Sequence, residues 1–436
     1  MGRATRLLDR TPEEIEVLLG HPVQHETARL IAQLVAELRS LRSPGDYYEF
    51  QRELFSHVYH AQQRQAEASR NAKRIRSGRP VPEPDAPTWD LALVLWDRSV
   101  RQLRAVGDAL AWRRFGYDRR FILALSRNQT PAPIVDKGGL DHELGAVVEA
   151  WERDGNFALL HDLTNSVRIG DLTVFESSQP TIVEVKASEP SGSRHREQVR
   201  RAQRAVAVIN EGATLPGAAE DVELLVSDQQ FKTRLDRLRS QLERARVDGI
   251  SSQSIGHQQA ITAIAVTARI DQSTDDLYRR SDALKSRAFA KAGLDTVDHH
   301  LRGVRADRIG WDPHLAPFTV FPFAPEVVAA LTTDLVCFEY VVGWDRLADA
   351  FEARGFDVEL LLEEASGPIA ADVAVLHDHR SDLRITIHSG GLDQLLHELV
   401  DVDRFVDAVA QVARRLHTIG VTRSVFTFMN ERATWR

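Results

Sequence analysis

Two short runs rich in β-branched residues, 167–175 and 181–187, are separated by a polar link that contains a proline. Runs of this length and composition on either side of a short polar link are typical of a β-hairpin. Side chains alternate between the two faces of a strand, so Glu184 and Lys186 lie on one face and their apolar neighbours on the other. Asp171 on the first strand can therefore lie beside both of them.

This combination of side chains has a specific chemistry. Asp171 and Glu184 offer the oxygen ligands that Mg²⁺ or Mn²⁺ prefers, and such an ion can polarise a phosphate and acidify a water. Lys186 stands out because only six of the 55 basic residues are lysines. A lysine amine can shift its pKa and position a water, whereas an arginine guanidinium is a permanent planar charge. The pattern therefore indicates a phosphodiester-cleaving site.

These residues resemble the PD-(D/E)xK superfamily of restriction-endonuclease-like nucleases, in which an acid on one strand is followed by Glu-x-Lys on the next. Asp171 and the triplet Glu184-Val185-Lys186 match that pattern, although a glycine precedes Asp171 where the family pattern has a proline. The resemblance implies that Asp171, Glu184 and the Val185 carbonyl hold Mg²⁺ or Mn²⁺. It also implies that Lys186 orients or activates the attacking water.

The family core has a helix before the hairpin that often carries a glutamate facing the metal. Residues 138–155 have apolar side chains at helical spacing, and Gly155 is the expected stop. Glu143 is the candidate acid of this helix, as a further metal ligand and catalytic residue. Spacing alone selects it over Glu149 and Asp162, so these two acids stay open as alternatives.

A second family helix follows the hairpin, and residues 194–210 have the apolar stripe that predicts it. The resemblance implies that Gln198 belongs to the active site. The basic side chains of the same helix are the candidate nucleic-acid-binding residues: Arg194, Arg196, Arg200 and Arg201. Taken alone, this basic face is slightly more typical of the solvated side of an amphipathic helix than of a nucleic-acid-binding surface. Its position next to Glu184 and Lys186 favours the binding interpretation.

The fold class expected from the whole chain is α/β. A restriction-endonuclease-like mixed-sheet core would be flanked by an N-terminal helical domain and a C-terminal α/β or α+β domain. We expect four regions: a helical region at 1–79, a helical connector at 88–130, the nuclease-like core at 136–270 and the accessory domain at 271–436. Strands at 222–226 and 260–268 would complete the core sheet. In the accessory domain the patterns predict a helix at 296–305, a strand at 318–323 and one long helix at 392–416.

Composition limits the partners. The formal net charge of −8 gives no general attraction to polyanions, so a nucleic-acid surface must be local. The sequence has no apolar signal region and no run long enough to span a bilayer, which favours a cytoplasmic protein without membrane contact. The resemblance further implies DNA as substrate in preference to RNA, and a role in bacterial restriction or antiphage defence. The chain would act there as a homo-oligomer or with a partner protein.

Two other interpretations remain. Asp171, Glu184 and Lys186 could form a solvated charge cluster across two strands, which contributes little to stability. Alternatively, the chain could have a nuclease fold that has lost turnover and only binds nucleic acid or serves as a scaffold, because a fold alone does not fix a function.

Overall fold

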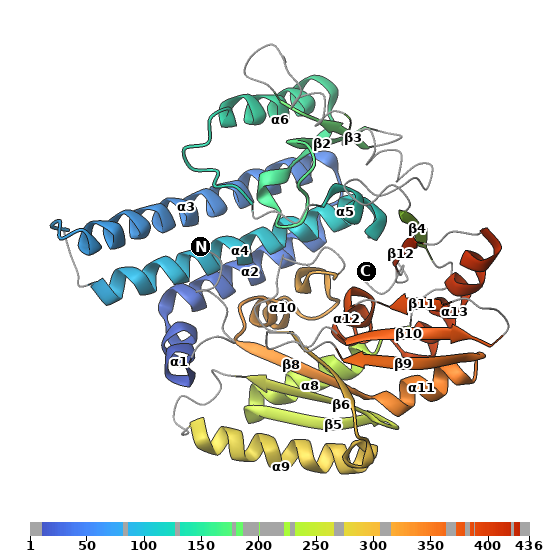
Figure 1. The fold of residues 1–436 in the computed structure, drawn as a ribbon. Helices are drawn as coiled ribbons and strands as arrows, with labels where there is room; N and C mark the ends of the chain where they lie inside the picture. Colours follow the sequence, from blue (N-terminus) through green and yellow to red (C-terminus); the bar gives the residue numbers. More distant parts are fainter. Residues whose placement is uncertain are drawn as a thin grey trace. The chain divides into compact units, whose positions relative to one another are not determined.

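The computed structural model divides the chain into two compact units (Figure 1). It describes residues 11–81, 86–126, 131–176, 180–185, 200, 222–226, 232–265, 274–305, 315–362, 372–379, 384–387, 389–419 and 423–427. The first unit comprises Met1–Glu211, Asp307–Pro313 and Pro317–Asp334. The second unit comprises Gly212–Ala306, His314–Ala316 and Leu335–Arg436. The boundary therefore falls inside the range 136–270, which the sequence indicates as one core.

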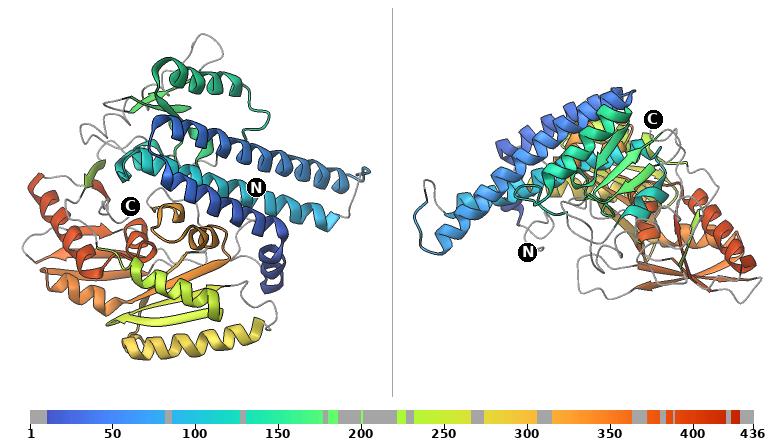
Figure 2. Two further views of the ribbon diagram at one scale, coloured as in Figure 1. Left: turned by 180° about the vertical axis from the view of Figure 1, so that it is seen from behind. Right: turned by 90° about the horizontal axis from the view of Figure 1, so that it is seen from above.

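Helices form most of the first unit and confirm the expected helical N-terminal region. They are α1 (Pro12–Gly20), α2 (Pro22–Ser40), α3 (Pro44–Arg76), α4 (Ala86–Arg114), α5 (Arg119–Leu125) and α10 (Pro325–Thr332). Thr11 caps α1 through a reciprocal pair of hydrogen bonds with Glu14, and a proline occupies the first helical turn. Figures 1 and 2 show α3 and α4 running side by side. None of the helices in the described ranges is long and apolar enough to cross a membrane.

The hairpin expected from the sequence is present in the first unit, with shorter strands. Helix α6 (Leu140–Asp154) ends at Gly155, which has a left-handed φ of 65°. Strand β1 (Phe157–Leu160), the 3₁₀ turn η2 (His161–Leu163), β2 (Leu172–Phe175) and β3 (Pro180–Val183) follow. The strands form an antiparallel sheet in the order β1-β2-β3. Leu172 pairs with Val183 at one end of the hairpin, and Phe175 pairs with Pro180 at the other.

The second unit contains three sheets among its described residues. An antiparallel sheet in the order β5-β6-β8-β7 consists of β5 (Ile250–Gly256), β6 (Gln259–Ala265), β8 (Val336–Gly343) and β7 (His300–Arg305). Another antiparallel sheet consists of β9 (Phe356–Leu362), β10 (Asp372–Asp378) and β11 (Arg384–Ile387). Strands β4 (Val222–Val226) and β12 (Arg423–Thr427) pair in parallel. The helices are α8 (Leu235–Asp248), α9 (Thr274–Ala292), α11 (Trp344–Glu352), α12 (Ser389–His397) and α13 (Val402–Ile419), and a 3₁₀ turn, η3 (Leu294–Thr296), follows α9.

The mixed sheet that the resemblance implies is not found among the described residues. The strands expected at 222–226 and 260–268 exist as β4 and β6, but β4 pairs with β12, and β6 pairs with β5 and β8. The reason lies in β5. Its Ile-Ser-Ser-Gln-Ser-Ile-Gly sequence is mostly polar and hides a strand from a search for apolar periodicity. Because β5 and β8 pair with the two edges of β6, β6 belongs to a sheet of the second unit and not to a sheet with the β2–β3 hairpin.

Three further elements differ from the sequence prediction. The helix expected at 296–305 is strand β7, in which buried Leu301 and exposed Arg302 show the alternation of a strand. The strand expected at 318–323 begins with the 3₁₀ turn η4 (Phe318–Val320), because a short, largely apolar run has no diagnostic period. The helix expected at 392–416 is interrupted between α12 and α13, where Leu399 has a φ of 50°.

Helix α4 approaches the loop after β1 more closely than an alanine would permit. Gly107 is buried on this helix, and a Cβ built on it would lie 1.8 Å from the carbonyl oxygen of Leu163. The obstacle is backbone, which cannot rotate away as a side-chain end can. The glycine therefore sets the distance between the helix and the loop that leads to β2.

We predict that Gly107→Ala lowers the free energy of unfolding by about 3 kcal/mol, because the added methyl group must push the loop away from α4. Gly145→Ala is the matched control, since an added Cβ at this exposed helical position meets no atom within 4 Å. That variant should gain about 0.5–1 kcal/mol from helix propensity. Urea unfolding of both variants measures the difference, and equal stabilities would contradict the close approach.

Candidate active site

Asp171, Glu184 and Val185 meet at one end of the β2–β3 hairpin. Asp171 directly precedes β2, and Glu184 and Val185 directly follow β3, at the end where Leu172 pairs with Val183. The Asp171 amide donates to the Val183 carbonyl at 2.9 Å. The Val185 amide donates to Oδ2 of Asp171 at 2.8 Å. The carboxylate of Asp171 is thus fixed against the backbone that carries Glu184.

The backbone conformation at residue 170 explains why a glycine, and not a proline, precedes Asp171. It has a φ of 82°, which a proline ring cannot adopt because it fixes φ near −65°. A Cβ at this position would also lie 2.5 Å from Cγ2 of Ile182 and 3.3 Å from the Val183 carbonyl oxygen. The glycine therefore lets the chain turn against β3 just before Asp171. The departure from the proline of the family pattern has a local steric cause.

Glu143 is buried in the first turn of α6. Its ion-pair partner is Lys137, which the sequence pattern did not predict as a site residue. The Lys137 ammonium lies 2.7 and 2.8 Å from the two carboxylate oxygens of Glu143. The same ammonium lies 2.6 Å from Oδ2 of Asp162. Glu143 and Asp162, considered above as alternatives, thus belong to one cluster, whereas Glu149 is exposed and paired with Arg153.

The electrostatics of this cluster are unusual for a glutamate. Burial raises the pKa of Glu143 to about 7, and the negative charges of Asp171 and Asp162 add to that effect. Lys137 acts in the opposite direction by hydrogen bonding and by charge. The pKa of Lys137 itself is raised, because its two carboxylate partners outweigh its burial. The influence of Asp171 on Glu143 links the cluster to the hairpin end.

A signal for Lys137 was present in the sequence. It is one of only six lysines in a chain that otherwise carries its positive charge on arginines. It also lies three residues before the first residue of α6. The argument from lysine scarcity that selected Lys186 therefore applies equally to Lys137. Its contact with Asp162, by contrast, depends on the fold of an intervening loop.

That loop is anchored to α4 by a buried carboxylate. Asp108 accepts the backbone amides of Asn165 and Ser166, both at 2.9 Å, and the Ser166 hydroxyl at 2.6 Å. It also accepts the side-chain amide of Asn165 at 2.9 Å. Burial raises the pKa of Asp108. One turn earlier, Nε of Arg104 donates to the Asp162 carbonyl at 2.9 Å. These bonds fix the backbone that presents Asp162 to Lys137.

His161 holds the backbone around Asp171 in place and is not available as a metal ligand. Its Nδ1 donates to the Gly170 carbonyl at 2.9 Å, so its Nε2 accepts from the Thr173 hydroxyl at 2.7 Å. Both ring nitrogens are therefore engaged. Burial lowers the pKa of His161 to about 4, which keeps the ring neutral at physiological pH. Its backbone amide also donates to the Asp171 carbonyl at 3.0 Å.

Part of the predicted site lies outside the described residues. These positions are Lys186, Gln198, Arg194, Arg196 and Arg201. Arg200 is described and is exposed in a helical conformation. Their roles stay predictions from the sequence.

The oxygen donors at the hairpin end suit a hard divalent cation. Mg²⁺ is usually held by one or two carboxylates, with waters and substrate phosphate completing its shell. Asp171 and Glu184 could provide the two carboxylates. Asp171 accepts the Val185 amide with one oxygen, which leaves its other oxygen for a cation. Glu143 is held on Lys137 instead. In the ranges that the structure describes, no three Asp, Glu, His or Cys side chains are arranged to enclose a metal by themselves.

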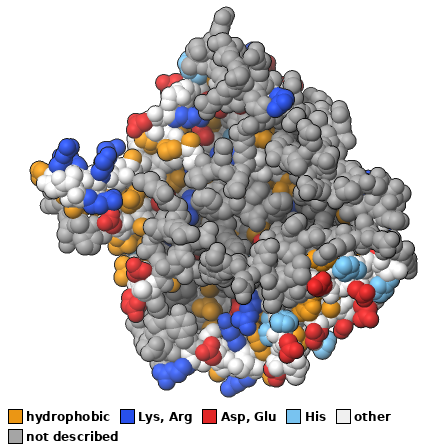
Figure 3. All heavy atoms as spheres, viewed as in Figure 1, with side chains coloured by type: hydrophobic (Ala, Val, Ile, Leu, Met, Phe, Trp, Pro, Cys, Tyr) orange, Lys and Arg blue, Asp and Glu red, His pale blue; other side chains and the backbone are white. Residues whose placement is uncertain are grey.

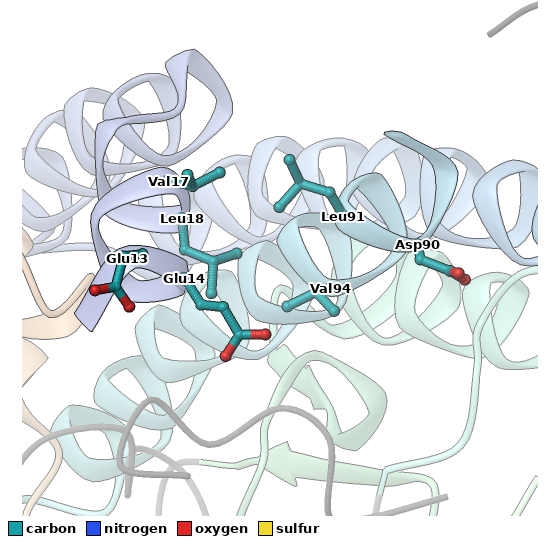
Figure 4. Close-up of a pocket in the computed structure, with 7 residues that line it drawn as sticks. All are labelled: Glu13, Glu14, Val17, Leu18, Asp90, Leu91 and Val94. Atoms are coloured by element: carbon teal, nitrogen blue, oxygen red, sulfur yellow. The ribbon is translucent and has the colours of Figure 1, made fainter. Parts of the chain in front are cut away.

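A separate cavity of about 490 Å³ lies between α1 and α4 (Figure 4). Its lining consists of apolar and acidic side chains: Glu13, Glu14, Val17, Leu18, Asp90, Leu91 and Val94. None of these is basic, and three carry negative charge, so the cavity is unsuited to a phosphate group. None belongs to the predicted site. The candidate active site therefore stays at the hairpin end.

Comparisons of this chain with protein-family models, with curated proteins and with solved structures found no match.

We predict that His161 makes stability depend on pH. A buried histidine whose pKa is lowered must take up a proton on unfolding, so its stabilising contribution is complete above about pH 6.5 and is lost as the pH falls towards 4. The loss over this window should reach about 3 kcal/mol. Urea unfolding at pH 7, 6 and 5 should show a flatter pH dependence for His161→Gln than for the native chain. His142→Gln, at an exposed position of α6, should keep the native dependence.

Lys137→Met should lower the free energy of unfolding by about 2 kcal/mol, because it leaves two largely buried carboxylates without their cation. The loss should be larger at pH 8 than at pH 6, since Glu143 can be protonated at the lower pH. Lys291→Met, at an exposed position of α9, is the control and should have little effect at either pH. A loss for Lys137→Met that is independent of pH would contradict the assigned coupling.

Proposed function

We propose that this chain is a divalent-metal-dependent endonuclease that hydrolyses nucleic-acid phosphodiester bonds, with DNA as the preferred substrate. The observation that carries the proposal is the meeting of Asp171 and Glu184 at one end of the hairpin, with the Asp171 carboxylate fixed by the Val185 amide. The resemblance of Asp171 and the Glu184-Val185-Lys186 triplet to the PD-(D/E)xK nucleases supports the same reading. The proposed setting is bacterial restriction or antiphage defence in the cytoplasm, as a homo-oligomer or with a partner protein.

In the proposed reaction, water attacks phosphorus and gives up a proton to solvent, while the bond to the leaving oxygen breaks and that oxygen takes up a proton from solvent. A Mg²⁺ or Mn²⁺ ion held by Asp171, Glu184 and the Val185 carbonyl would stabilise the negative charge that develops on the phosphate. Lys186 would donate a hydrogen bond to the attacking water and hold its lone pair towards phosphorus. Gln198 and the neighbouring arginines, Arg200 among them, would position the phosphate.

Glu143 would support this site through charge. Its contacts in the structure are with Lys137, and Asp171 raises its pKa. We propose that Lys137 lowers the electrostatic cost of holding Glu143 and Asp162 close to Asp171, and so supports the position of the Asp171 carboxylate. Lys137 would thus be a positioning residue that acts through the carboxylates.

A second candidate is a protein that uses the same surface to bind nucleic acid without cutting it. One observation favours it: Glu143, a further acid of the predicted metal set, is held on Lys137. This alternative predicts binding that does not depend on Mg²⁺ or Mn²⁺ and is unaffected by changes at Asp171.

The proposed function predicts metal-dependent cleavage by the purified chain. We expect Asp171→Asn, Glu184→Gln and Lys186→Met each to reduce cleavage by about 100-fold or more, because each removes a ligand or the group that orients the water. Cleavage of duplex DNA, single-stranded DNA and RNA should be measured with Mg²⁺, with Mn²⁺ and with chelator.

Glu149→Gln is the matched control, because this exposed acid lies on α6 and pairs with Arg153. It should keep the native rate. Cleavage that persists in the Asp171 and Glu184 variants, or in chelator, would overturn the proposal. Metal-independent binding without cleavage, unchanged by these substitutions, would support the binding-only alternative.

A further inference from the structure

The hairpin of α3 and α4 forms an arm that extends beyond the neighbouring helix of the first unit. Helix α3 has 33 residues and α2 has 19. At 1.5 Å per residue they are about 50 and 28 Å long, so α3 is about 20 Å longer. Figures 1 and 2 show the C-terminal end of α3 and the N-terminal end of α4 projecting past the end of α2.

The end of this arm is strongly basic. Residues 68–81 contain five basic side chains and no acid, and all five residues are exposed: Arg70, Lys73, Arg74, Arg76 and Arg79. We call these five residues the arm tip. Figure 3 shows Lys and Arg side chains gathered where this end projects. The next acids in the chain, Glu83 and Asp85, lie outside the described residues.

The basic side chains of the arm tip have no acidic partner among the described residues. The nearest arginine before them along α3, Arg64, pairs with Glu67 at 2.8 Å and lies over the ring of Trp96. By contrast, no ion pair joins any of the five arm-tip residues to an acid in the described ranges. Arg76 donates from Nε to the Ala72 carbonyl, which leaves its other guanidinium nitrogens for a ligand. Five exposed charges without an acidic partner in the described ranges form a local positive surface that attracts anions, although the chain has a net charge of −8.

Their spacing fits a repeating anion better than a single one. Arg70, Lys73 and Arg74 are related by three and four residues, so they are neighbours on one face of α3. From Arg70 to Arg76 the helix rises about 9 Å. One strand of duplex DNA carries a charge about every 3.4 Å along its axis, so this length faces two or three phosphates.

We propose that the arm tip is a second nucleic-acid contact, which binds the phosphate backbone without reading bases and anchors the substrate away from the hairpin end. The choice of nucleic acid as the polyanion rests on the proposed nuclease function. Phosphate contacts of this kind give affinity and position but carry no sequence information. The arm would therefore affect binding and its salt dependence rather than the chemical step.

The test measures binding of the full-length chain to a fluorescent 30-base-pair duplex in chelator, across a series of salt concentrations. The arm-tip variant combines Lys73→Gln, Arg74→Gln and Arg76→Gln. The control variant combines Arg52→Gln, Arg153→Gln and Arg237→Gln, which removes the same charge from side chains that are 63, 66 and 57% exposed elsewhere. Counterion release predicts that the slope of log K against log salt falls by about 2 to 3 for the arm-tip variant only.

An unchanged slope in the arm-tip variant, or an equal change in both variants, would overturn the proposal. So would loss of binding to anionic phospholipid vesicles with DNA binding intact, which would make the arm tip a membrane contact. The result is separable from the proposed function. If the chain cuts no substrate but the slope depends on the arm tip, the arm-tip contact is supported and the nuclease function is not. If the chain cuts DNA but the slope does not depend on the arm tip, the nuclease function is supported and the arm-tip contact is not.

Discussion

The buried contact between α4 and the loop after β1 is the constraint on which the candidate site depends. The Asp108 carboxylate accepts four hydrogen bonds from Asn165 and Ser166, and Gly107 permits the close approach that these bonds need. A buried carboxylate without such partners would be costly, so the loop and the helix specify each other's position. Because this loop carries Asp162 and leads to Asp171, a helix 57 residues earlier in the chain determines where both acids lie.

The acids collected there repel one another, and the fold offsets that repulsion with one lysine. Glu143 is buried near the charges of Asp162 and Asp171, and its pKa rises to about 7 as a result. Lys137 bridges Glu143 and Asp162 but does not contact Asp171 in any hydrogen bond or ion pair among the described residues. Negative charge is therefore compensated on one side of the cluster and concentrated on the hairpin side. That asymmetry is what a cation-binding carboxylate at Asp171 would require.

The parts of the site that the sequence predicts are those set by neighbouring residues. The hairpin and α6 follow from local patterns, and the short polar link places Asp171 and Glu184 at the same end. The contact between Lys137 and Asp162 spans 25 residues and depends on a loop held by α4, so no local pattern contains it. The core sheet was predicted incorrectly for a related reason. Strand β5 is mostly polar, and a strand without apolar periodicity cannot be anticipated as the partner that draws β6 into another sheet.

The central claim is that Asp171 and Glu184 bind a divalent cation in the presence of nucleic acid. Binding of Mn²⁺ to the full-length chain, followed by electron paramagnetic resonance with a non-cleavable duplex present, tests this directly and does not require turnover. The account predicts one tightly bound Mn²⁺ per chain, lost in Asp171→Asn and retained when the exposed acid Glu149 is changed to Gln. Equal Mn²⁺ binding by the native chain and the Asp171 variant, or no binding by either, would contradict it.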